Sequence, residues 1–263
     1  MRSINRDGVA LCYEEVAGTG TPVLLVHGWC CNHAHFAPQF EHFAALGHRV
    51  VAVDLRGHGA SDKPQQRYTM AGFADDLAWL CSKLELVKPI VIGHSMGGIV
   101  SFELAGRHPG VPSAIVLVDS SVAMPPASRE SFANMLALLG GSDYQTAMRD
   151  FVTKSLFIAS DDAVRRAQIV AEMSSTAQHV MLSAMEAVRG YEPTEAAAGL
   201  TVPCLYIAAN MVPLRSDPAR LRELVPGLHY GMTVGAGHFC QLEVPDQVNA
   251  MIDRFLVVSG VAE

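Results

Sequence analysis

The sequence has few cysteines and no long apolar run. Six cysteines occur in 263 residues, none with Cys-x-x-Cys spacing, and the adjacent pair Cys30 and Cys31 cannot easily bridge each other. This usage argues against a disulfide framework and indicates reduced thiols. No uninterrupted apolar stretch reaches the roughly 18 residues that a membrane helix needs, and no apolar stretch follows the arginines near the start. We therefore expect a cytoplasmic protein with no secretory signal and no membrane partner.

Positive charge is also scarce. Nineteen Lys and Arg stand against 26 Asp and Glu, which gives a formal net charge of −7, and the basic residues do not cluster. A nucleic-acid partner is not expected, because such proteins need a basic surface. The chain is instead 50% hydrophobic and 17% charged, which excludes a disordered chain. Its length suits one large domain, with or without an insertion. The composition does not indicate an oligomeric state.

Short apolar runs rich in β-branched residues recur along the chain. They lie at residues 23–26, 50–53, 90–92, 114–118 and 204–208. Such runs are typical of parallel strands covered on both faces, and helical patterns such as 69–86 separate them. The alternation predicts an α/β, doubly wound sheet with its ligand site at the carboxyl ends of the strands. Residues 9–16, followed by the turn cluster 18–22, predict an antiparallel starter hairpin.

The stretch from residue 122 to residue 200 breaks this alternation, because its pattern predicts helices only. The helical patterns lie at 128–139, 143–157, 163–173 and 177–188. We interpret the stretch 122–200 as a helical cap, or lid, inserted over the strand ends. Residues 1–121 and 201–263 then form the α/β core. The apolar side chains of the cap fit a helix core better than a substrate wall, because helices bury apolar stripes by default.

The strongest local motif is Gly93-His94-Ser95-Met96-Gly97-Gly98, which follows the run 90–92 and precedes a helical pattern at 99–107. A Gly-x-Ser-x-Gly match arises by chance in roughly one such chain in ten, but the strand-turn-helix context makes it much more specific. The flanking glycines allow a tight turn that lifts the Ser95 hydroxyl clear of the sheet. Ser95 is therefore the candidate nucleophile. The alternative is a glycine-rich turn with a capping serine.

A nucleophilic serine needs a base, and His238 is the candidate. It follows the last expected strand, 229–234, which places it at the same sheet edge as Ser95. His94 is expected to be a structural neighbour of the nucleophile. His33 and His35 lack the cysteine or carboxylate spacing of a metal site, so we expect no metal.

An oxyanion hole needs two backbone N–H donors. The first candidate is Met96, directly after the nucleophile. The second is Trp29, in the loop after residues 23–26, where Gly28 lets the chain approach closely.

Together these segments resemble the α/β-hydrolase superfamily. In family order, the matching segments are His27-Gly28-Trp29, residues 54–61, residues 93–98 and Gly235-Ala236-Gly237-His238-Phe239. The resemblance covers nearly the whole chain outside the cap. It implies the α/β-hydrolase fold, a Ser–His–acid triad and an acyl-enzyme mechanism. We expect no cofactor.

The chain departs from the family pattern at the acid. The family usually places an aspartate a few residues after the penultimate strand, where this chain has Val212. Asp217 is the next carboxylate, but Ser-Asp-Pro before a helical pattern is typical of an N-cap. Asp119 ends the run 114–118, and the resemblance extends to branches, the haloalkane dehalogenases among them, that take their acid there. We favour Asp119, with Asp217 or no acid as alternatives. Asp119 could also only anchor its loop.

The pattern predicts a carboxylic ester hydrolase acting on small or medium, mostly apolar acyl esters or lactones, with a small-molecule ester as its partner. Haloalkane dehalogenases and epoxide hydrolases use a carboxylate nucleophile, which Ser95 argues against.

Two other functions remain open. Gly28-Trp29-Cys30 and Asp119 also resemble cofactor-independent ring-cleaving dioxygenases, although Cys31 and Met96 stand where those enzymes tend to carry histidine. The Val212 position keeps a non-catalytic ligand-binding homologue open.

Overall fold

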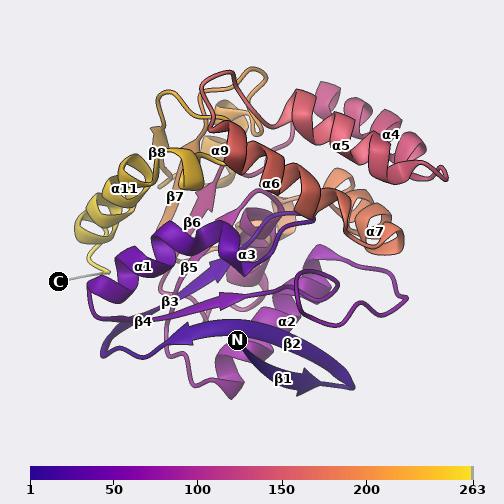
Figure 1. The fold of residues 1–263 in the computed structure, drawn as a ribbon. Coiled ribbons are helices and arrows are strands. Elements are labelled where there is room, and N and C mark those ends of the chain that lie inside the picture. Colours follow the sequence, from indigo (N-terminus) through magenta and orange to yellow (C-terminus); the bar gives the residue numbers. More distant parts are fainter. Residues whose placement is uncertain (262–263) are drawn as a thin grey trace.

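A single mostly parallel sheet forms the centre of the molecule (Figure 1). The computed structural model describes residues 1–261. Within this range the sheet has eight strands in the order β1-β2-β4-β3-β5-β6-β7-β8. The strands are β1 (Arg2–Arg6), β2 (Val9–Val16), β3 (Gly20–Val26), β4 (His48–Val53), β5 (Ile90–His94), β6 (Ala114–Val118), β7 (Cys204–Ala208) and β8 (His229–Met232). The pairs from β4 to β8 are parallel, and β1 and β2 pair antiparallel. The predicted α/β class is confirmed.

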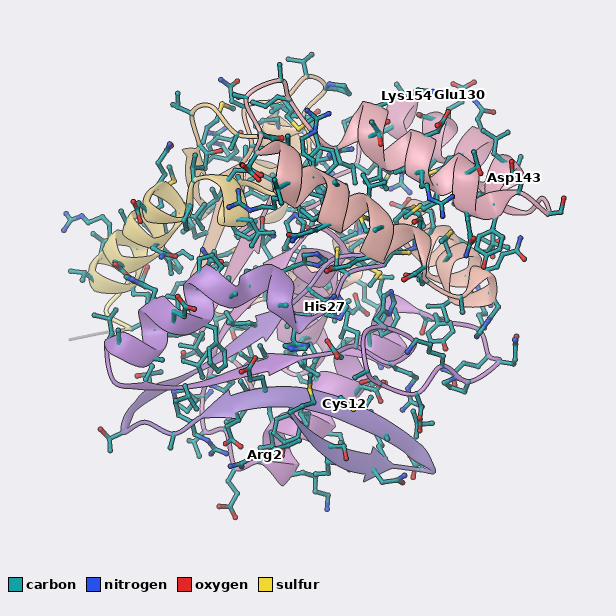
Figure 2. All side chains as sticks on the ribbon, viewed as in Figure 1. Arg2, Cys12, His27, Glu130, Asp143 and Lys154 are labelled. Carbon is teal, nitrogen blue, oxygen red and sulfur yellow. The ribbon has the colours of Figure 1, made fainter. Side chains whose placement is uncertain are left out.

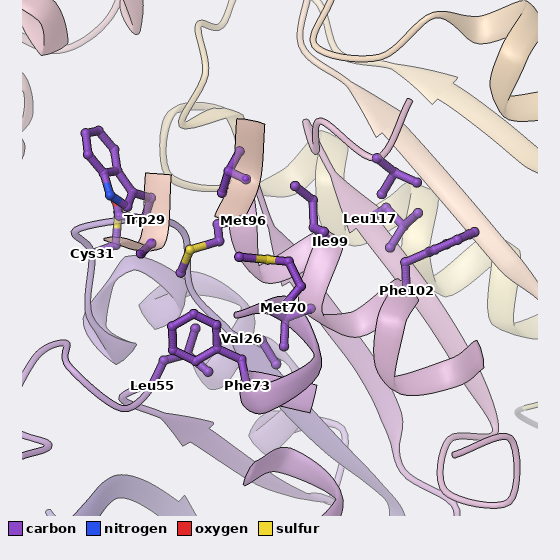
Figure 3. Close-up of a cluster of buried hydrophobic side chains, with 14 of the residues drawn as sticks. Val26, Trp29, Cys31, Leu55, Met70, Phe73, Met96, Ile99, Phe102 and Leu117 are labelled. Carbon is purple, nitrogen blue, oxygen red and sulfur yellow. The ribbon is translucent and has the colours of Figure 1, made fainter. Parts of the chain in front are cut away.

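Helices cover both faces of the sheet, which explains the continuous apolar strands. Val23 and Leu25 of β3 pack with α1 and α11, whereas Leu24 and Val26 pack with α2 and α3 on the opposite face. Figure 3 shows part of the apolar cluster on the α2 and α3 face, in which Phe73 of α2 lies among strand and helix side chains. The helices named here are α1 (Ala37–Ala45), α2 (Met70–Lys83), α3 (Met96–Arg107) and α11 (Pro245–Val258).

The starter hairpin differs from the prediction. β2 turns back on β1 at Asp7 and Gly8, and its other edge pairs with β4 and not with β3. Asp7 has φ 53° and Gly8 has φ 85°, the left-handed conformation that tight two-residue hairpins need. The turn cluster 18–22 instead leads into β3, which runs parallel to β4.

Five helices fill the segment between β6 and β7. They are α4 (Pro126–Leu139), α5 (Tyr144–Ser155), α6 (Ala163–Ser174), α7 (Gln178–Arg189) and α8 (Thr194–Gly199). Helices α4 to α7 lie together above the strand ends (Figure 1). Helix α8 packs on α3, where a side chain at Gly106 would overlap the Ala196 backbone. The segment between β6 and β7, predicted to be a cap, is therefore packed on α3 at its C-terminal end.

The remaining elements are short. They are the 3-10 helix η1 (His33–Phe36), α9 (Pro218–Leu224) and α10 (Cys240–Glu243). None of the helices in residues 1–261 has the length and apolar character that crossing a membrane requires.

Candidate active site

Ser95 occupies a strained turn between β5 and α3. Its backbone has φ 53° and ψ −118°, a conformation rare for a residue with a side chain. The turn is held from both sides, since a side chain at Gly97 would overlap the Val26 carbonyl and one at Gly93 would overlap Gly97. The Ser95 hydroxyl is partly exposed and makes no hydrogen bond to any residue in the described part of the chain. Close packing thus presents a free hydroxyl at the sheet edge.

His238 is fixed by three hydrogen bonds. Its Nδ1–H donates to Asp119 Oδ2 at 2.6 Å. Its backbone N–H donates to Leu156 O at 2.9 Å, and its carbonyl accepts from His94 Nε2 at 2.9 Å. Because an ionised carboxylate only accepts, the Nδ1 contact places the proton there and leaves Nε2 as the basic nitrogen. His238 and Ser95 line the same cavity.

Asp119 is buried at the end of β6, with φ 42°. Its Oδ1 accepts the Ala209 N–H at 3.0 Å, so both carboxylate oxygens have partners. The next residue, Ser120, is held through its carbonyl, which accepts from Tyr206 Oη and Ser216 Oγ, both at 2.7 Å. The loop after β6 is therefore rigid, and its strained backbone aims the carboxylate at the imidazole.

The two other acid positions lie elsewhere. Val212 is 96% exposed to solvent. Asp217 is the N-cap of α9, where its Oδ1 accepts from Ala219 N at 2.8 Å and from Arg220 N at 3.3 Å. Among the described residues the Asp217 side chain bonds to no histidine, and its capping contacts account for its presence.

Trp29 and Met96 line the same cavity as Ser95, and their backbone N–H groups are unpaired among the described residues. Gly28 lies against the nucleophile, since a Cβ there would come within 3.1 Å of Ser95 Cβ. The indole Nε1 of Trp29 donates to Met181 O at 2.9 Å, which ties this loop to α7 of the cap.

His27 holds the Trp29 loop, a role that the sequence analysis did not assign. Its Nδ1–H donates to Gly28 O at 2.7 Å, and its Nε2 accepts the Leu55 N–H at 3.0 Å. Burial, and next the neighbouring His58, lowers the pKa of His27 to about 3. The ring therefore stays neutral, as both hydrogen bonds require. The one feature of the sequence that could have indicated this role is the position of His27 directly after β3 and before Gly28.

The cavity at Ser95 is small and largely apolar. Its volume is about 30 Å³, which holds about one water molecule. The cap supplies Phe132, Phe151, Met173 and Met185 from four different helices. Because the cavity is so small, a larger ligand requires these side chains to move. Some cap side chains thus do line the cavity, although most apolar ones were expected only to form the helix core.

Arg215 is the charged residue of this cavity that the sequence analysis missed. Its Nε lies 3.8 Å from Asp119 Oδ2, and its Nη2 donates to Ser155 O at 2.8 Å. The pKa of His238 is lowered by burial and next by the Arg215 charge, against the opposing effect of Asp119. No local motif marks Arg215, because the fold alone brings it to the imidazole.

His33 and His35 each pair with a carboxylate that is distant in sequence. His33 Nδ1 lies 2.9 Å from Asp54 Oδ1, and His35 Nε2 lies 3.1 Å from Glu172 Oε2 on α6. Asn32 Nδ2 donates to the same Glu172 oxygen at 3.2 Å, so this contact also ties the cap to the core. Within residues 1–261, no cluster of three or more His, Cys, Asp or Glu side chains could hold a metal ion.

Comparisons with known proteins match this geometry to one family. A family model described as alpha/beta hydrolase fold matches residues 21–164, more than half of the chain. The AB hydrolase superfamily protein YisY of Bacillus subtilis is 38% identical over 102 residues, which cover 39% of this chain and 38% of that protein. The chain spans only 31% to 38% of the length of the first curated relatives that it matches.

Solved structures match almost the whole chain, and two from Burkholderia are examples. The enol-lactonase from Burkholderia xenovorans LB400 has a TM-score of 0.87 and 24% identity, over 97% of this chain and 100% of that one. A putative aryl esterase from Burkholderia cenocepacia has a TM-score of 0.82 and 26% identity, over 98% and 99% of the two chains. The first of these likenesses shows the fold alone.

Proposed function

The chain belongs to the α/β-hydrolase fold family, and from this premise we propose that it hydrolyses carboxylic esters through an acyl-enzyme on Ser95. The proposed substrates are small or medium, mostly apolar acyl esters, lactones included. The likeness to a putative aryl esterase at 26% identity favours this class. The apolar side chains of Phe132, Phe151, Met173 and Met185 suit an apolar acyl group.

One observation carries the proposal. Asp119 Oδ2 accepts from His238 Nδ1 at 2.6 Å, while Ser95 and His238 line one cavity. This contact gives the imidazole the tautomer that a general base needs, with Nε2 unprotonated on the serine side. A buried carboxylate also stabilises the imidazolium that forms when the base takes a proton. Nucleophile, base and acid thus come from the loops after β5, β8 and β6.

In the first step, His238 Nε2 takes the Ser95 proton as Ser95 Oγ attacks the ester carbonyl carbon. The negative charge that develops on the carbonyl oxygen is held by the free N–H groups of Trp29 and Met96. Burial and the Arg215 charge lower the pKa of His238, so the imidazole is neutral at pH 7 and ready to accept the proton.

In the second step, the imidazolium of His238 protonates the leaving alkoxide, and the alcohol departs. A water molecule then loses a proton to His238 and attacks the acyl-enzyme, which releases the carboxylic acid and returns Ser95 to its hydroxyl form. Apolar side chains of the cap border these charges, and an apolar surrounding strengthens the electrostatic interactions within the site.

Ester turnover and covalent labelling test the proposal. We expect wild-type protein to hydrolyse 4-nitrophenyl butyrate and to take up a fluorophosphonate probe on Ser95. Ser95→Ala should lose both, with kcat reduced to the background of the uncatalysed reaction or close to it. Ser82→Ala, a change at an exposed serine of α2, is the matched control and should keep both.

Three results would contradict the proposal. Retained turnover in Ser95→Ala would remove the serine from the mechanism. Tight ligand binding without labelling or turnover would indicate a non-catalytic homologue. Oxygen consumption with a hydroxyquinolone substrate, in the absence of ester turnover, would indicate the ring-cleaving dioxygenase.

A further inference from the structure

A second, wider cavity adjoins the one at Ser95. Its volume is about 570 Å³, and it lies between α4, α5 and the loop after β7. The two cavities share Phe132, Phe151 and Arg215 in their linings. The guanidinium therefore stands at the boundary between the small reactive cavity and a larger space that could hold the rest of a substrate.

The Lys and Arg side chains that line these two cavities are positive, whereas the chain as a whole has a negative net charge. The whole chain carries −7, yet neither cavity has an aspartate or glutamate in its lining. Arg215 lines both, and Lys154 of α5 lines the wider one. The Lys154 side chain is 71% exposed, and Figure 2 labels it at the edge of the molecule. Lys154 also pairs with Asp150 at 2.7 Å. Arg215 is thus the principal positive charge near the reacting atoms.

Arg215 has donor capacity that the protein leaves unused. Its Nε is buried and has no hydrogen-bond partner among the described residues, and 3.8 Å to Asp119 is too long for a hydrogen bond. Asp119 cannot offer much more, since its two oxygens already accept from His238 and Ala209. The side chain is 17% exposed, and of its two terminal nitrogens only Nη2 bonds to a described residue, so Nη1 keeps donors that a ligand oxygen can accept.

We propose that Arg215 binds a carboxylate of the substrate, so that the preferred esters or lactones carry a negative charge a few bonds from the scissile carbonyl. A guanidinium fork matches a carboxylate in shape and charge and can bind it with two parallel hydrogen bonds. The proposal rests on the ester hydrolysis proposed above and specifies its substrate class.

The experiment compares matched anionic and neutral esters. One pair, mono-4-nitrophenyl glutarate and 4-nitrophenyl pentanoate, places the charge on the acyl side. The other pair, 4-acetoxybenzoate and its methyl ester, places it on the leaving group. We expect the ratio of kcat/KM, anionic over neutral, to fall about tenfold or more in Arg215→Gln for at least one pair. The ratio cancels any change in the reactivity of His238, which affects both members of a pair alike.

Two further variants serve as a control and as a conservative change in the comparison of anionic with neutral esters. Arg220→Gln removes an exposed arginine on α9 and should leave both ratios unchanged. Arg215→Lys keeps a positive charge beside Asp119 but loses the fork, so its ratio should fall severalfold. If Arg215→Gln does not fold, as judged by circular dichroism, Arg215→Lys carries the test. Unchanged ratios for both pairs in the folded Arg215 variants would overturn the proposal.

A binding measurement separates this inference from the proposed function. We expect glutarate to raise the melting temperature of wild-type and Ser95→Ala protein, and to lose this effect in Arg215→Gln. Binding that depends on Arg215 without any ester turnover would support carboxylate binding at Arg215 and reject the hydrolase. Turnover at Ser95 with no Arg215-dependent binding or selectivity would do the reverse.

Discussion

The loops after β6 and β7 begin at neighbouring strand ends, yet they place side chains of opposite charge near His238. The first loop is buried and strained, and its Asp119 carboxylate contacts the imidazole at 2.6 Å. The second loop exposes Val212 where the family pattern expects an acid, and supplies Arg215 from its far end. Because β6 and β7 are adjacent parallel strands, their carboxyl ends reach the same imidazole from neighbouring positions.

This comparison shows that a carboxylate after β6 meets the imidazole although the family pattern expects an acid after β7. That this carboxylate is the acid of a triad stays a prediction. A carboxylate after β6 can reach Nδ1 as long as the backbone turns it inward, which the left-handed conformation of Asp119 achieves. On the proposed mechanism, the loop after β7 is then free to carry another function. The cation that we assign to substrate binding occupies that loop.

The largest effect is expected at the acid. Asp119→Asn keeps the shape of the side chain but removes its charge and disturbs the imidazole tautomer, so kcat for 4-nitrophenyl butyrate should fall by about 10³–10⁴-fold. Thermal unfolding monitors whether the variant is folded. Asp217→Asn is the control for Asp119→Asn. It removes a carboxylate from the loop after β7 but keeps a side chain that can cap α9, so kcat should stay unchanged. If Asp217→Asn lost activity and Asp119→Asn kept it, the roles of the two loops would be exchanged.

A smaller effect concerns the pH dependence. In the proposed mechanism His238 acts in its neutral form, and burial together with Arg215 lowers its pKa from the ordinary 6.5. The value of kcat/KM should therefore rise with pH to a plateau, with the inflection below pH 6.5. Removing the cation in Arg215→Gln should raise the pKa and move this inflection to higher pH. The profile is measured with a neutral ester.

The surface arginine variant Arg220→Gln provides the reference profile for that measurement. An inflection that stays in place in Arg215→Gln would mean that the guanidinium does not act on the imidazole. An inflection that moves to lower pH would contradict the sign of the interaction.

The smallest effect is one of stability alone. Asp217→Ala removes the acceptor for two backbone N–H groups at the start of α9. The free energy of unfolding should fall by about 1 kcal/mol, or about 2–4 °C in melting temperature, with kcat unchanged. Asp217→Asn should melt close to the wild type. A loss of kcat in Asp217→Ala at unchanged stability would assign this residue to the site and not to the helix.

Much of the fold was predictable because it depends on local patterns. The apolar runs became strands buried on both faces. Residues 93–98 became the strand-turn-helix around Ser95, since only glycine fits against Val26 and Gly97 there. The family prediction from four short segments is confirmed. The starter hairpin was predicted wrongly, because the turn at Asp7 and Gly8 is only two residues long and has no apolar strand before it.

The site could be predicted only where one segment carries its own geometry. The roles predicted for Ser95, Trp29 and Met96 rest on such segments and stay predictions. Arg215 and His27 do not belong to such segments, because their partners lie far away in the chain: Arg215 meets Asp119 and Ser155, and His27 meets Leu55. Their importance arises from burial and charge at the meeting point, which no spacing in the sequence encodes.

The sequence by itself determined the strands, the strained serine turn and the family, because glycine sterics and apolar periodicity act over a few residues. Only the tertiary structure decided which carboxylate meets the His238 ring and that Arg215 stands beside it. Hydrogen bonds and charges act over a few ångströms, and only the packing of β6, β7 and the cap brings these groups within that range.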